Sequence, residues 1–286
     1  MSRLYQVAGH CFKVSGENLC SALESLSGFE PFAVECADAQ LSFVEDSANV
    51  APEILESLYS FAYEDVTCLF GKTKSGYLLS LKPELEEGLY MWHEQGSSEV
   101  IISGHLSPML LQYALWVGFG ILLAPYETVA IHSSCVVYGD KAVIFLGESG
   151  TGKSTHTKLW LENIKHTTLL NDDSPILRVE DGRIWVYGSP WSGKTPCYKQ
   201  EKYELKACVR LSQAKYNQIT KLPVLQAYAS VHPSCPPMFA YDETLYDHIS
   251  LIIDRMISSL PFYHLACLPD IDACELSFKT IFDSRA

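Results

Sequence analysis

Apolar runs in the second half of the chain alternate with short turns and predict a strand-rich fold. Residues 129–138 and 141–146 have the pattern of two strands joined as a hairpin by Gly139-Asp140, and residues 155–164 have helical spacing. The other strands expected in this half are 167–170, 176–178, 183–187, 205–211 and 262–268, and the other helices are 246–260 and 271–282. This order of elements indicates an α/β fold class.

The first hundred residues carry a weaker pattern. Residues 5–14 alternate around Gly9 and predict a hairpin, and residues 18–26 have helical spacing. Residues 41–43 and 77–81 have the pattern of further strands. We therefore expect a small α+β N-terminal domain at 1–105, with a role in recognising an acceptor, and a nucleotide-binding domain at 106–286.

One segment, 106–126, has no charged residue and is long enough to span a bilayer. Gln112 interrupts it, and no cluster of Lys or Arg flanks it. Ser107-Pro108 is a typical helix start, with proline in the first turn. The segment is interpreted as a buried core helix, with a membrane span as the alternative.

Charge and cysteine content narrow the classes of partner. The 286 residues include 21 Lys plus Arg and 34 Asp plus Glu, so the formal net charge is −13. An acidic surface repels nucleic acid and anionic lipid, and neither is expected as a partner. The ten cysteines form no C-x-x-C pair, and residues 1–10 lack the apolar core of a signal peptide. A cytoplasmic protein with reduced thiols is the expectation, and a disulfide framework is the alternative.

The octet GESGTGKS at 147–154 fits the phosphate-binding pattern G-x-x-x-x-G-K-[ST] at every position. Glycines let successive backbone N–H groups turn toward one point, where the helix N-terminus also stabilises phosphates. Lys153 can reach the β- and γ-phosphates, and the Ser154 hydroxyl can ligate Mg²⁺. The residues expected to contact the nucleotide are Gly147, Glu148, Ser149, Gly150, Thr151, Gly152, Lys153, Ser154 and Thr155.

Asp172 and Asp173 close a short predicted strand about twenty residues after the loop. Ligands of open α/β sheets collect at the carboxyl ends of strands, so these acids could lie beside the phosphates. A nucleotide-bound Mg²⁺ needs carboxylate help, and phosphoryl transfer needs a group that takes the acceptor's proton. Asn-Asp-Asp-Ser-Pro is also good turn chemistry, which is the alternative interpretation.

A family resemblance follows from these motifs. His132, the loop GESGTGKST and the sequence LLNDD together resemble the catalytic domain of HPr kinase/phosphorylase. They look still more like the HPr kinase-related proteins often found beside peptide-modifying enzymes, a group that shares a P-loop fold with phosphoenolpyruvate carboxykinase. The resemblance runs from about residue 131 to the C-terminus and includes GSPWSGK at 188–194 and FYHLACLPDIDACEL at 262–276.

The resemblance implies roles for individual residues. Asp172 matches the acid that accepts the hydroxyl proton, and Asp173 matches the neighbour that supports the metal with Ser154. His132 matches a histidine near the reacting phosphate, although a core histidine is the alternative. Lys194 is either a second phosphate contact or a solvated turn lysine. Asn171 replaces a small hydrophobic residue of the family, and the first hundred residues do not resemble its N-terminal domain, so HPr itself is not expected as the acceptor.

Three functions remain open from the sequence. The first is a kinase that transfers the γ-phosphoryl group to a serine-type hydroxyl of a peptide, protein or small metabolite, with ATP, GTP or pyrophosphate as donor. The second is a carboxykinase-like metabolic enzyme. The third is a nucleotide-binding regulator or chaperone of a peptide-modifying system, with little turnover. The doubled acid favours the first, because a binding protein needs no base. The oligomeric state is open, and a homo-oligomer is one alternative.

Overall fold

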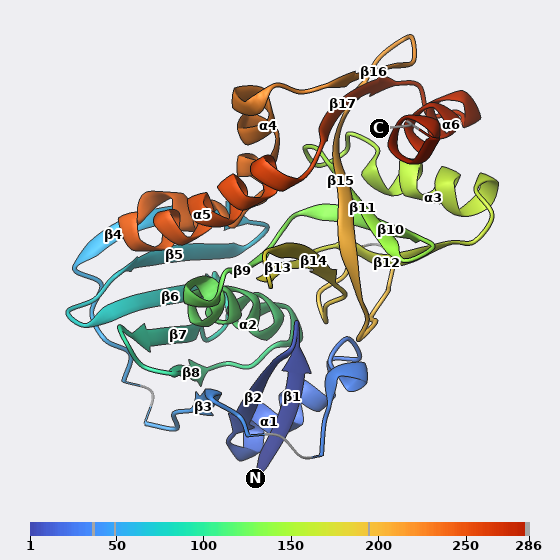
Figure 1. Cartoon of the computed structure of the whole chain (residues 1–286). Helices are drawn as coiled ribbons and strands as arrows, with labels where there is room; N and C mark the ends of the chain where they lie inside the picture. Colours follow the sequence, from blue (N-terminus) through green and yellow to red (C-terminus); the bar gives the residue numbers. More distant parts are fainter. Residues whose placement is uncertain (36–37, 49, 194, 284–286) are drawn as a thin grey trace. The chain divides into compact units, whose positions relative to one another are not determined.

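The computed structural model describes residues 1–35, 38–48, 50–193 and 195–283 and divides the chain into two compact units (Figure 1). The first consists of Met1–Pro125 with Met238–Tyr246, and the second of Tyr126–Pro237 with Asp247–Ala286. Each unit contains a mixed β-sheet with helices, so the fold is a strand-rich α/β structure, as the sequence predicts.

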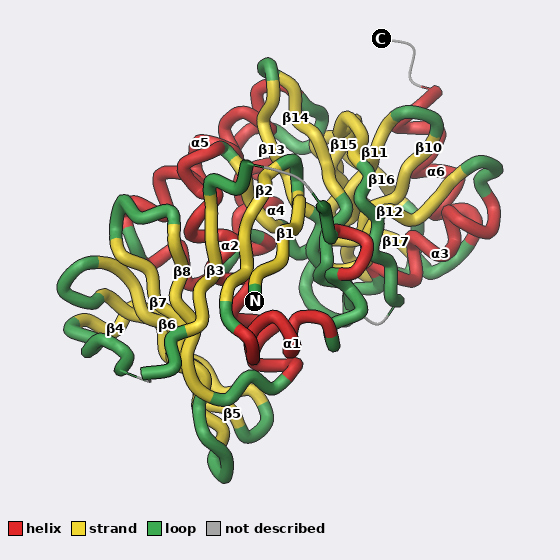
Figure 2. Tube along the Cα trace, turned by 90° about the horizontal axis from the view of Figure 1, so that it is seen from below, coloured by secondary structure: helices red, strands yellow, loops and turns green. Residues whose placement is uncertain are grey.

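The sheet of the first unit has the strand order β1-β2-β3-β8-β7-β6-β5-β4 within the described residues, which Figure 2 shows from below. Pairs β2/β3 and β3/β8 are parallel, and the other neighbours are antiparallel. The strands are β1 (Ser2–Val7), β2 (His10–Ser15), β3 (Leu41–Glu45), β4 (Glu56–Tyr63), β5 (Val66–Lys72), β6 (Gly76–Pro83), β7 (Leu89–Glu94) and β8 (Glu99–Gly104). The hairpin predicted at 5–14 is β1–β2, and the predicted helix at 18–26 is α1 (Glu17–Glu24).

This sheet is larger than the sequence pattern predicts, because the pattern indicates no strand at β4, β5, β7 or β8. Strand β4 lies at the sheet edge and has no buried position, so no buried face requires apolar and polar residues to alternate along it. Strand β7 has four buried positions among six, including the consecutive run Met91, Trp92 and His93. A strand buried on both faces loses the two-residue period on which the prediction rests.

Helix α2 (Pro108–Leu123) is the charge-free segment, and it belongs to the first unit. By length and composition it could cross a membrane, and 67% of its most apolar stretch is buried inside the protein. A Cβ on Gly118 would lie 2.9 Å from Phe43 and 3.2 Å from Val100, so glycine lets the helix approach the sheet closely. The predicted boundary at 105 and 106 therefore falls between this helix and the sheet it packs against, whereas the compact units divide at Pro125.

A short segment from the second half of the chain, Met238–Tyr246, completes the first unit. Phe239 is buried and packs against Phe70, with ring centroids 6.4 Å apart. Asp242 accepts a hydrogen bond from Tyr77 Oη at 2.7 Å and forms an ion pair with Lys72 at 2.9 Å. It also accepts the backbone N–H of Leu245, in the first turn of α5 (Glu243–Ser259). These contacts satisfy a carboxylate that would otherwise be buried without partners.

The sheet of the second unit has the order β12-β10-β11-β15-β14-β13-β9 within the described residues, and β17 pairs with both β15 and β16. Strand β15 is parallel to β11 and also parallel to β17. The strands are β9 (Thr128–Ala130), β10 (Ser133–Tyr138), β11 (Lys141–Leu146), β12 (Thr167–Asp173), β13 (Ile176–Glu180), β14 (Arg183–Tyr187), β15 (Lys202–Gln213), β16 (Gln218–Lys221) and β17 (Phe262–Cys267).

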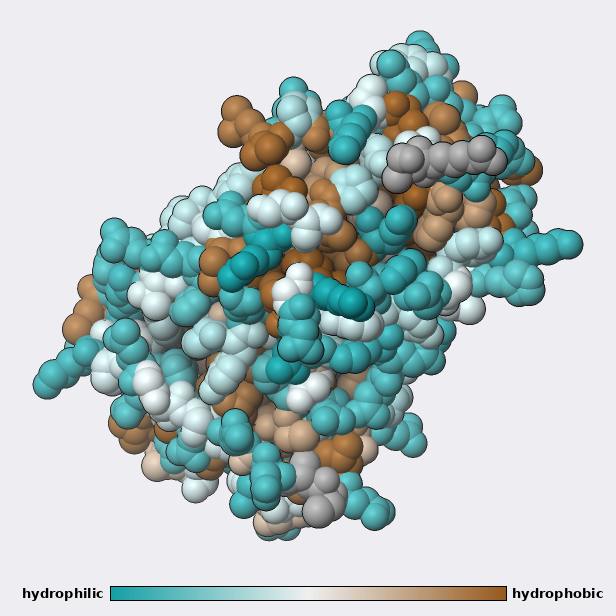
Figure 3. All heavy atoms as spheres, in the orientation of Figure 1, coloured by the Kyte–Doolittle hydropathy of each residue, from teal (hydrophilic) through white to brown (hydrophobic). Residues whose placement is uncertain are grey.

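Helices α3 (Lys153–Asn163) and α6 (Ile271–Phe278) lie side by side and pack with the sheet of the second unit (Figure 1). Trp160 of α3 is fully buried at the centre of their core, against Phe145 of β11 and Phe278 of α6. Most of α5, predicted at 246–260, also belongs to this unit, whereas α4 (Val224–Val231) has no counterpart among the predicted helices. Hydrophilic residues cover much of the face drawn in Figure 3, with apolar residues between them.

Two sequence predictions in this unit need correction. The single strand expected at 129–138 is two strands, because β9 pairs with β13 at one end of the sheet while β10 pairs with β11 and β12 near the other. His132 lies in the link between them and not in a strand. The closing helix ends at Phe278, and Lys279–Asp283 form a π-helical turn. All nine cysteines among the described residues have free thiols.

His156 is a buried histidine that joins α3 to α6. Its Nε2 atom lies 3.3 Å from Trp160 Nε1 and 3.1 Å from Ser277 Oγ. The indole nitrogen can only donate, so Nε2 accepts and the ring is neutral with its proton on Nδ1. Burial lowers the pKa of His156 from 6.5 to about 4. Protonation of this ring would place a charge in the core.

This shift predicts a loss of stability in mild acid. Because the pKa is lower in the folded than in the unfolded chain, the unfolded chain binds the proton first as the pH falls. The contribution of neutral His156 is complete above pH 6.5 and is lost as the pH falls toward about 4. The loss amounts to about 3 kcal/mol. The free energy of unfolding, measured with urea across this pH range, should depend less steeply on pH in His156→Gln than in the wild type. The exposed His166→Asn is the control and should keep the wild-type slope. Equal slopes in the wild type and both variants would contradict the role of His156.

Candidate functional site

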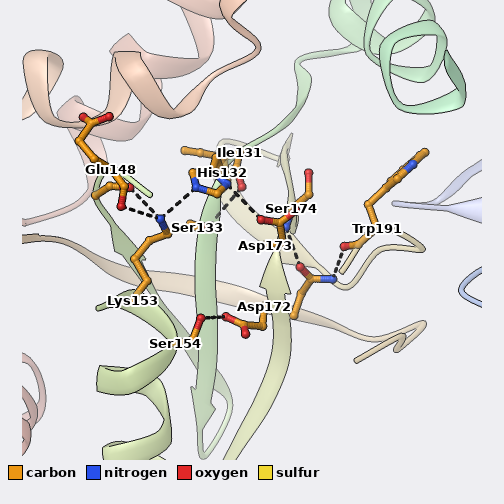
Figure 4. Close-up of polar contacts among 12 residues, drawn as sticks. Ile131, His132, Ser133, Glu148, Lys153, Ser154, Asp172, Asp173, Ser174 and Trp191 are labelled. Atoms are coloured by element: carbon orange, nitrogen blue, oxygen red, sulfur yellow. Dashed lines mark hydrogen bonds and ion pairs between the residues drawn. The ribbon is translucent and has the colours of Figure 1, made fainter. Parts of the chain in front are cut away.

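One edge of the second sheet gathers the residues that the sequence singles out. Strand β10 is antiparallel to both β11 and β12, so β11 and β12 end at the same edge where β10 begins. The glycine loop follows β11, Asp172 and Asp173 end β12, and His132 immediately precedes β10 (Figure 4). Strand β15 is parallel to β11 and ends at this edge too. The carboxyl edge of such strands is where α/β sheets bind ligands.

The loop at 147–154 owes its course to glycine. Gly147, Gly150 and Gly152 have φ angles of 152°, 81° and 102°, which side chains rarely allow. Gly152 is the N-cap of α3, and no side chain caps this helix terminus. Backbone N–H groups in the first turn of a helix lack intrahelical partners and favour a bound anion. Thr155 is exposed on this first turn.

Lys153 is the buried cation of the loop. Its Nζ atom donates to the carbonyl oxygens of Gly147 at 2.8 Å and Glu148 at 3.2 Å, and it lies 2.9 Å from His132 Nε2. Burial lowers the pKa of Lys153, while the carboxylates of Asp173, Asp172 and Glu148 act in the opposite direction. The lysine thus lies between two carbonyl oxygens of the loop and the ring of His132.

His132 connects this lysine to an acid. A lysine ammonium can only donate, so Nε2 of His132 accepts and the proton of the ring is on Nδ1. That Nδ1 atom lies 3.2 Å from Asp173 Oδ1, and the two side chains are 44% and 43% exposed. The backbone N–H of His132 is bound to the Ser234 carbonyl at 2.7 Å. The ring is therefore oriented between Lys153 and Asp173, and its exposed fraction is not that of a core histidine.

The two acids face different partners, as alternation along a strand requires. Asp172 is 5% exposed, and its Oδ1 atom accepts a hydrogen bond from Ser154 Oγ at 3.0 Å. The resemblance pairs Ser154 with Asp173 at the metal, whereas the structure brings Asp172 to Ser154 and Asp173 to His132. In the structure Asp172, and not Asp173, is therefore the acid that contacts the expected metal-binding serine.

Asn171 holds the end of the strand that carries the two acids. The sequence indicates only that this residue differs from the small hydrophobic residue of the family. Its side-chain nitrogen lies 3.0 Å from the Trp191 carbonyl and 3.2 Å from Ser189 Oγ, and its oxygen accepts the Ser174 N–H at 2.9 Å. A fully buried amide with these partners ties the end of β12 to the loop that contains GSPWSG.

The same loop closes onto the acids through Gly193, whose N–H donates to the Asp172 carbonyl at 2.7 Å. A Cβ at this position would lie 2.8 Å from that carbonyl oxygen and 3.2 Å from Asp173 Cβ. Glycine is therefore required for this close approach. The neighbouring Lys194, a predicted phosphate contact, lies outside the described residues.

Arg210 is a residue of this site that the sequence motifs do not indicate. It stands opposite Leu146 in the pairing of β15 with β11, one residue before the loop. Its Nη2 atom contacts Glu148 Oε1 at 2.6 Å and its Nη1 atom donates to the Ser230 carbonyl at 2.9 Å. The available signal was a lone cation between Val209 and Leu211 near the end of a predicted strand.

The oxygen atoms beside the loop fit a magnesium ion better than a metal held by protein alone. Within the described residues, no group of three His, Cys, Asp or Glu side chains could hold a metal. Mg²⁺ is usually bound through one or two protein oxygens, with phosphates and waters completing its shell. The Ser154 hydroxyl and the Asp172 carboxylate, 3.0 Å apart, provide such a pair.

Comparison with known proteins adds a distant structural likeness. No protein-family model matches the sequence, and no curated protein matches it. Among solved structures, the HPr(Ser) kinase/phosphatase from Coxiella burnetii aligns with 54% of this chain and 93% of its own length, at 12% identity and a TM-score of 0.30. A likeness of this size does not establish a family or an activity. The class defined by the structure is a strand-rich α/β protein with mixed sheets.

Proposed function

We propose that this protein is a phosphotransferase that binds a nucleoside triphosphate with Mg²⁺ at residues 147–154. It would transfer the γ-phosphoryl group to a serine-type hydroxyl of a peptide, protein or small metabolite. The observation that carries the proposal is the shared sheet edge, where the P-loop sequence, its lysine and two acids with separate partners meet. A cytoplasmic location, and partners that include neither nucleic acid nor membrane, are parts of the same proposal.

Ser154 and Asp172 would hold the metal side of the site. The serine hydroxyl is the residue type that ligates Mg²⁺ in this loop pattern, and the contact with Asp172 puts a carboxylate next to it. When bound, Mg²⁺ neutralises charge on the β- and γ-phosphates. Asp172 is almost completely buried and already engaged, which limits its access to an acceptor hydroxyl.

Asp173 is the better placed base. Its side chain is 43% exposed, and it lies against His132, which contacts Lys153. A base must reach the proton that it abstracts, so the exposed acid has the advantage. In the proposed step the acceptor oxygen bonds to the γ-phosphorus as the bond to the β-phosphate oxygen breaks. The hydroxyl proton passes to Asp173 and the nucleoside diphosphate leaves. This assignment exchanges the roles that the family resemblance gives to the two acids.

His132 and Lys153 would position the phosphate and the base relative to each other. Lys153 offers its ammonium to phosphate oxygens, and its contact with His132 links that position to Asp173. A regulator with little turnover would need the loop and Lys153 but not an oriented histidine and acid beside them. The His132–Asp173 contact therefore favours a transferase over the binding protein.

The test is a transfer assay by mass spectrometry. The full chain is incubated with Mg²⁺ and ATP, GTP or pyrophosphate, together with serine-containing peptides or small alcohols. We expect the donor to be consumed and one acceptor class to gain a phosphoryl group. The products of neighbouring genes are tested as acceptors in the same assay. If the donor binds but is not consumed with any of these acceptors, the protein is not a transferase and the nucleotide-binding regulator is the better interpretation. Absence of any nucleotide binding would contradict the proposal entirely.

A further inference from the structure

Arg210 and Glu148 form an ion pair across the glycine loop. The Arg210 side chain is 23% exposed and the Glu148 side chain is 71% exposed. Strand β15 carries Arg210 between Val209 and Leu211, which belong to the hydrophobic core. Its guanidinium therefore leaves the sheet on the other face and reaches Glu148 at 2.6 Å, while Ser230 of α4 accepts a second hydrogen bond at 2.9 Å. The second bond fixes the guanidinium beside the loop.

Glu148 is held by two cations at once. Its backbone oxygen accepts from Lys153 Nζ at 3.2 Å, and its carboxylate accepts from Arg210. The positive charge of Arg210 adds to burial in lowering the pKa of Lys153, so the two cations are near one another. Two cations that approach the same loop residue, one from the start of helix α3 and one from strand β15, are an arrangement that suits an anion of several charges.

The simplest alternative is an ordinary surface ion pair, which contributes little to stability. Other pairs of this unit are of that kind, such as Lys158–Glu162 and Arg183–Glu204, where one or both side chains are largely exposed. Arg210 differs because it is mostly buried, is anchored by a carbonyl and lies at the candidate phosphate site. A guanidinium binds carboxylate and phosphate through the same fork of donors.

We propose that Arg210 is a second phosphate-binding cation of this site, and that Glu148 is a built-in competitor for it. The inference rests on the proposed nucleotide function and extends it. A terminal phosphate carries more negative charge than a carboxylate, and it would replace Glu148 on the guanidinium. The exposed Glu148 side chain is free to turn into solvent when it is displaced. Arg210 would then distinguish nucleoside triphosphates from diphosphates.

The proposal predicts effects of opposite sign at the two residues. Arg210→Met should weaken MgATP binding by about 10- to 100-fold and affect MgADP much less, because a charge-assisted hydrogen bond to the terminal phosphate is lost. Arg210→Lys should recover part of the ATP affinity. Glu148→Gln should tighten MgATP binding by about three- to tenfold, because the competing charge is gone. In the Arg210→Met background, Glu148→Gln should change nothing.

Isothermal titration of the full chain with MgATP and MgADP measures these effects. Arg183→Met and Glu162→Gln remove the same charges from exposed ion pairs and should leave both affinities unchanged. Weaker ATP binding by Glu148→Gln would show that the ion pair only supports the loop and would overturn the inference. Equal losses for ATP and ADP in Arg210→Met would overturn it as well. Wild-type protein that binds neither nucleotide would overturn the proposed function, and this inference with it.

Discussion

Replacement of Lys153 by alanine is expected to lower the affinity for MgATP by about a hundredfold or more, since charge-assisted hydrogen bonds to phosphate are among the strongest in proteins. The Nζ atom already lies within 2.8–3.2 Å of two loop carbonyls, so it stands where phosphate oxygens would replace those acceptors. Its burial means that no water could compensate fully for a lost ammonium group.

Lys158 provides the matched control for this prediction. It lies on the same helix, its side chain is 73% exposed, and it pairs only loosely with Glu162 at 3.8 Å. Lys158→Ala should bind MgATP as the wild type does. Isothermal titration measures the affinity, and thermal unfolding checks that both variants are folded. Wild-type affinity in a folded Lys153→Ala protein would exclude the P-loop interpretation of residues 147–154.

Replacement of Asp173 by asparagine is expected to reduce phosphoryl transfer by about 10²–10⁴-fold, the usual contribution of a general base. Nucleotide affinity should be nearly unchanged, because Asp173 contacts His132 and not the loop. Added Mg²⁺ should not restore the rate. Asp172→Asn should behave differently, because Asp172 contacts Ser154. It should raise the Mg²⁺ concentration needed for activity and recover transfer when Mg²⁺ is in excess.

Transfer rates measured across a range of Mg²⁺ concentrations separate the two acids. Asp140 lies in the turn between β10 and β11, its side chain is 87% exposed, and Asp140→Asn is a matched control that should retain activity. If Asp172→Asn instead kept its nucleotide affinity and lost transfer at every Mg²⁺ concentration, Asp172 would be the base, as the family resemblance implies. Full activity in Asp173→Asn would exclude it from proton transfer.

Local patterns were sufficient for much of the second unit. Strand β11, the loop and helix α3 occur in the predicted order, and the hairpins β10–β11 and β13–β14 join neighbours in the sequence. Such elements depend on contacts over a few residues, which the sequence displays directly. The same approach missed β4 at a sheet edge and the buried β7, because neither shows the alternation of a strand exposed on one face.

The sequence by itself determined the pattern of the loop at 147–154, since the identity and spacing of three glycines, a lysine and a serine are local properties. Only the tertiary structure decided which side chains share the site. The break at His132 and the strand order bring the start of β10 and the ends of β12, β11 and β15 to one edge of the sheet. Arg210 reaches the loop only because β15 pairs with β11. An irregularity in the pairing of β10 with β12, between Cys135 and Val136, shifts the register by one residue. A shift of one residue exchanges the two faces of a strand, so the sequence could not show which acid meets Ser154.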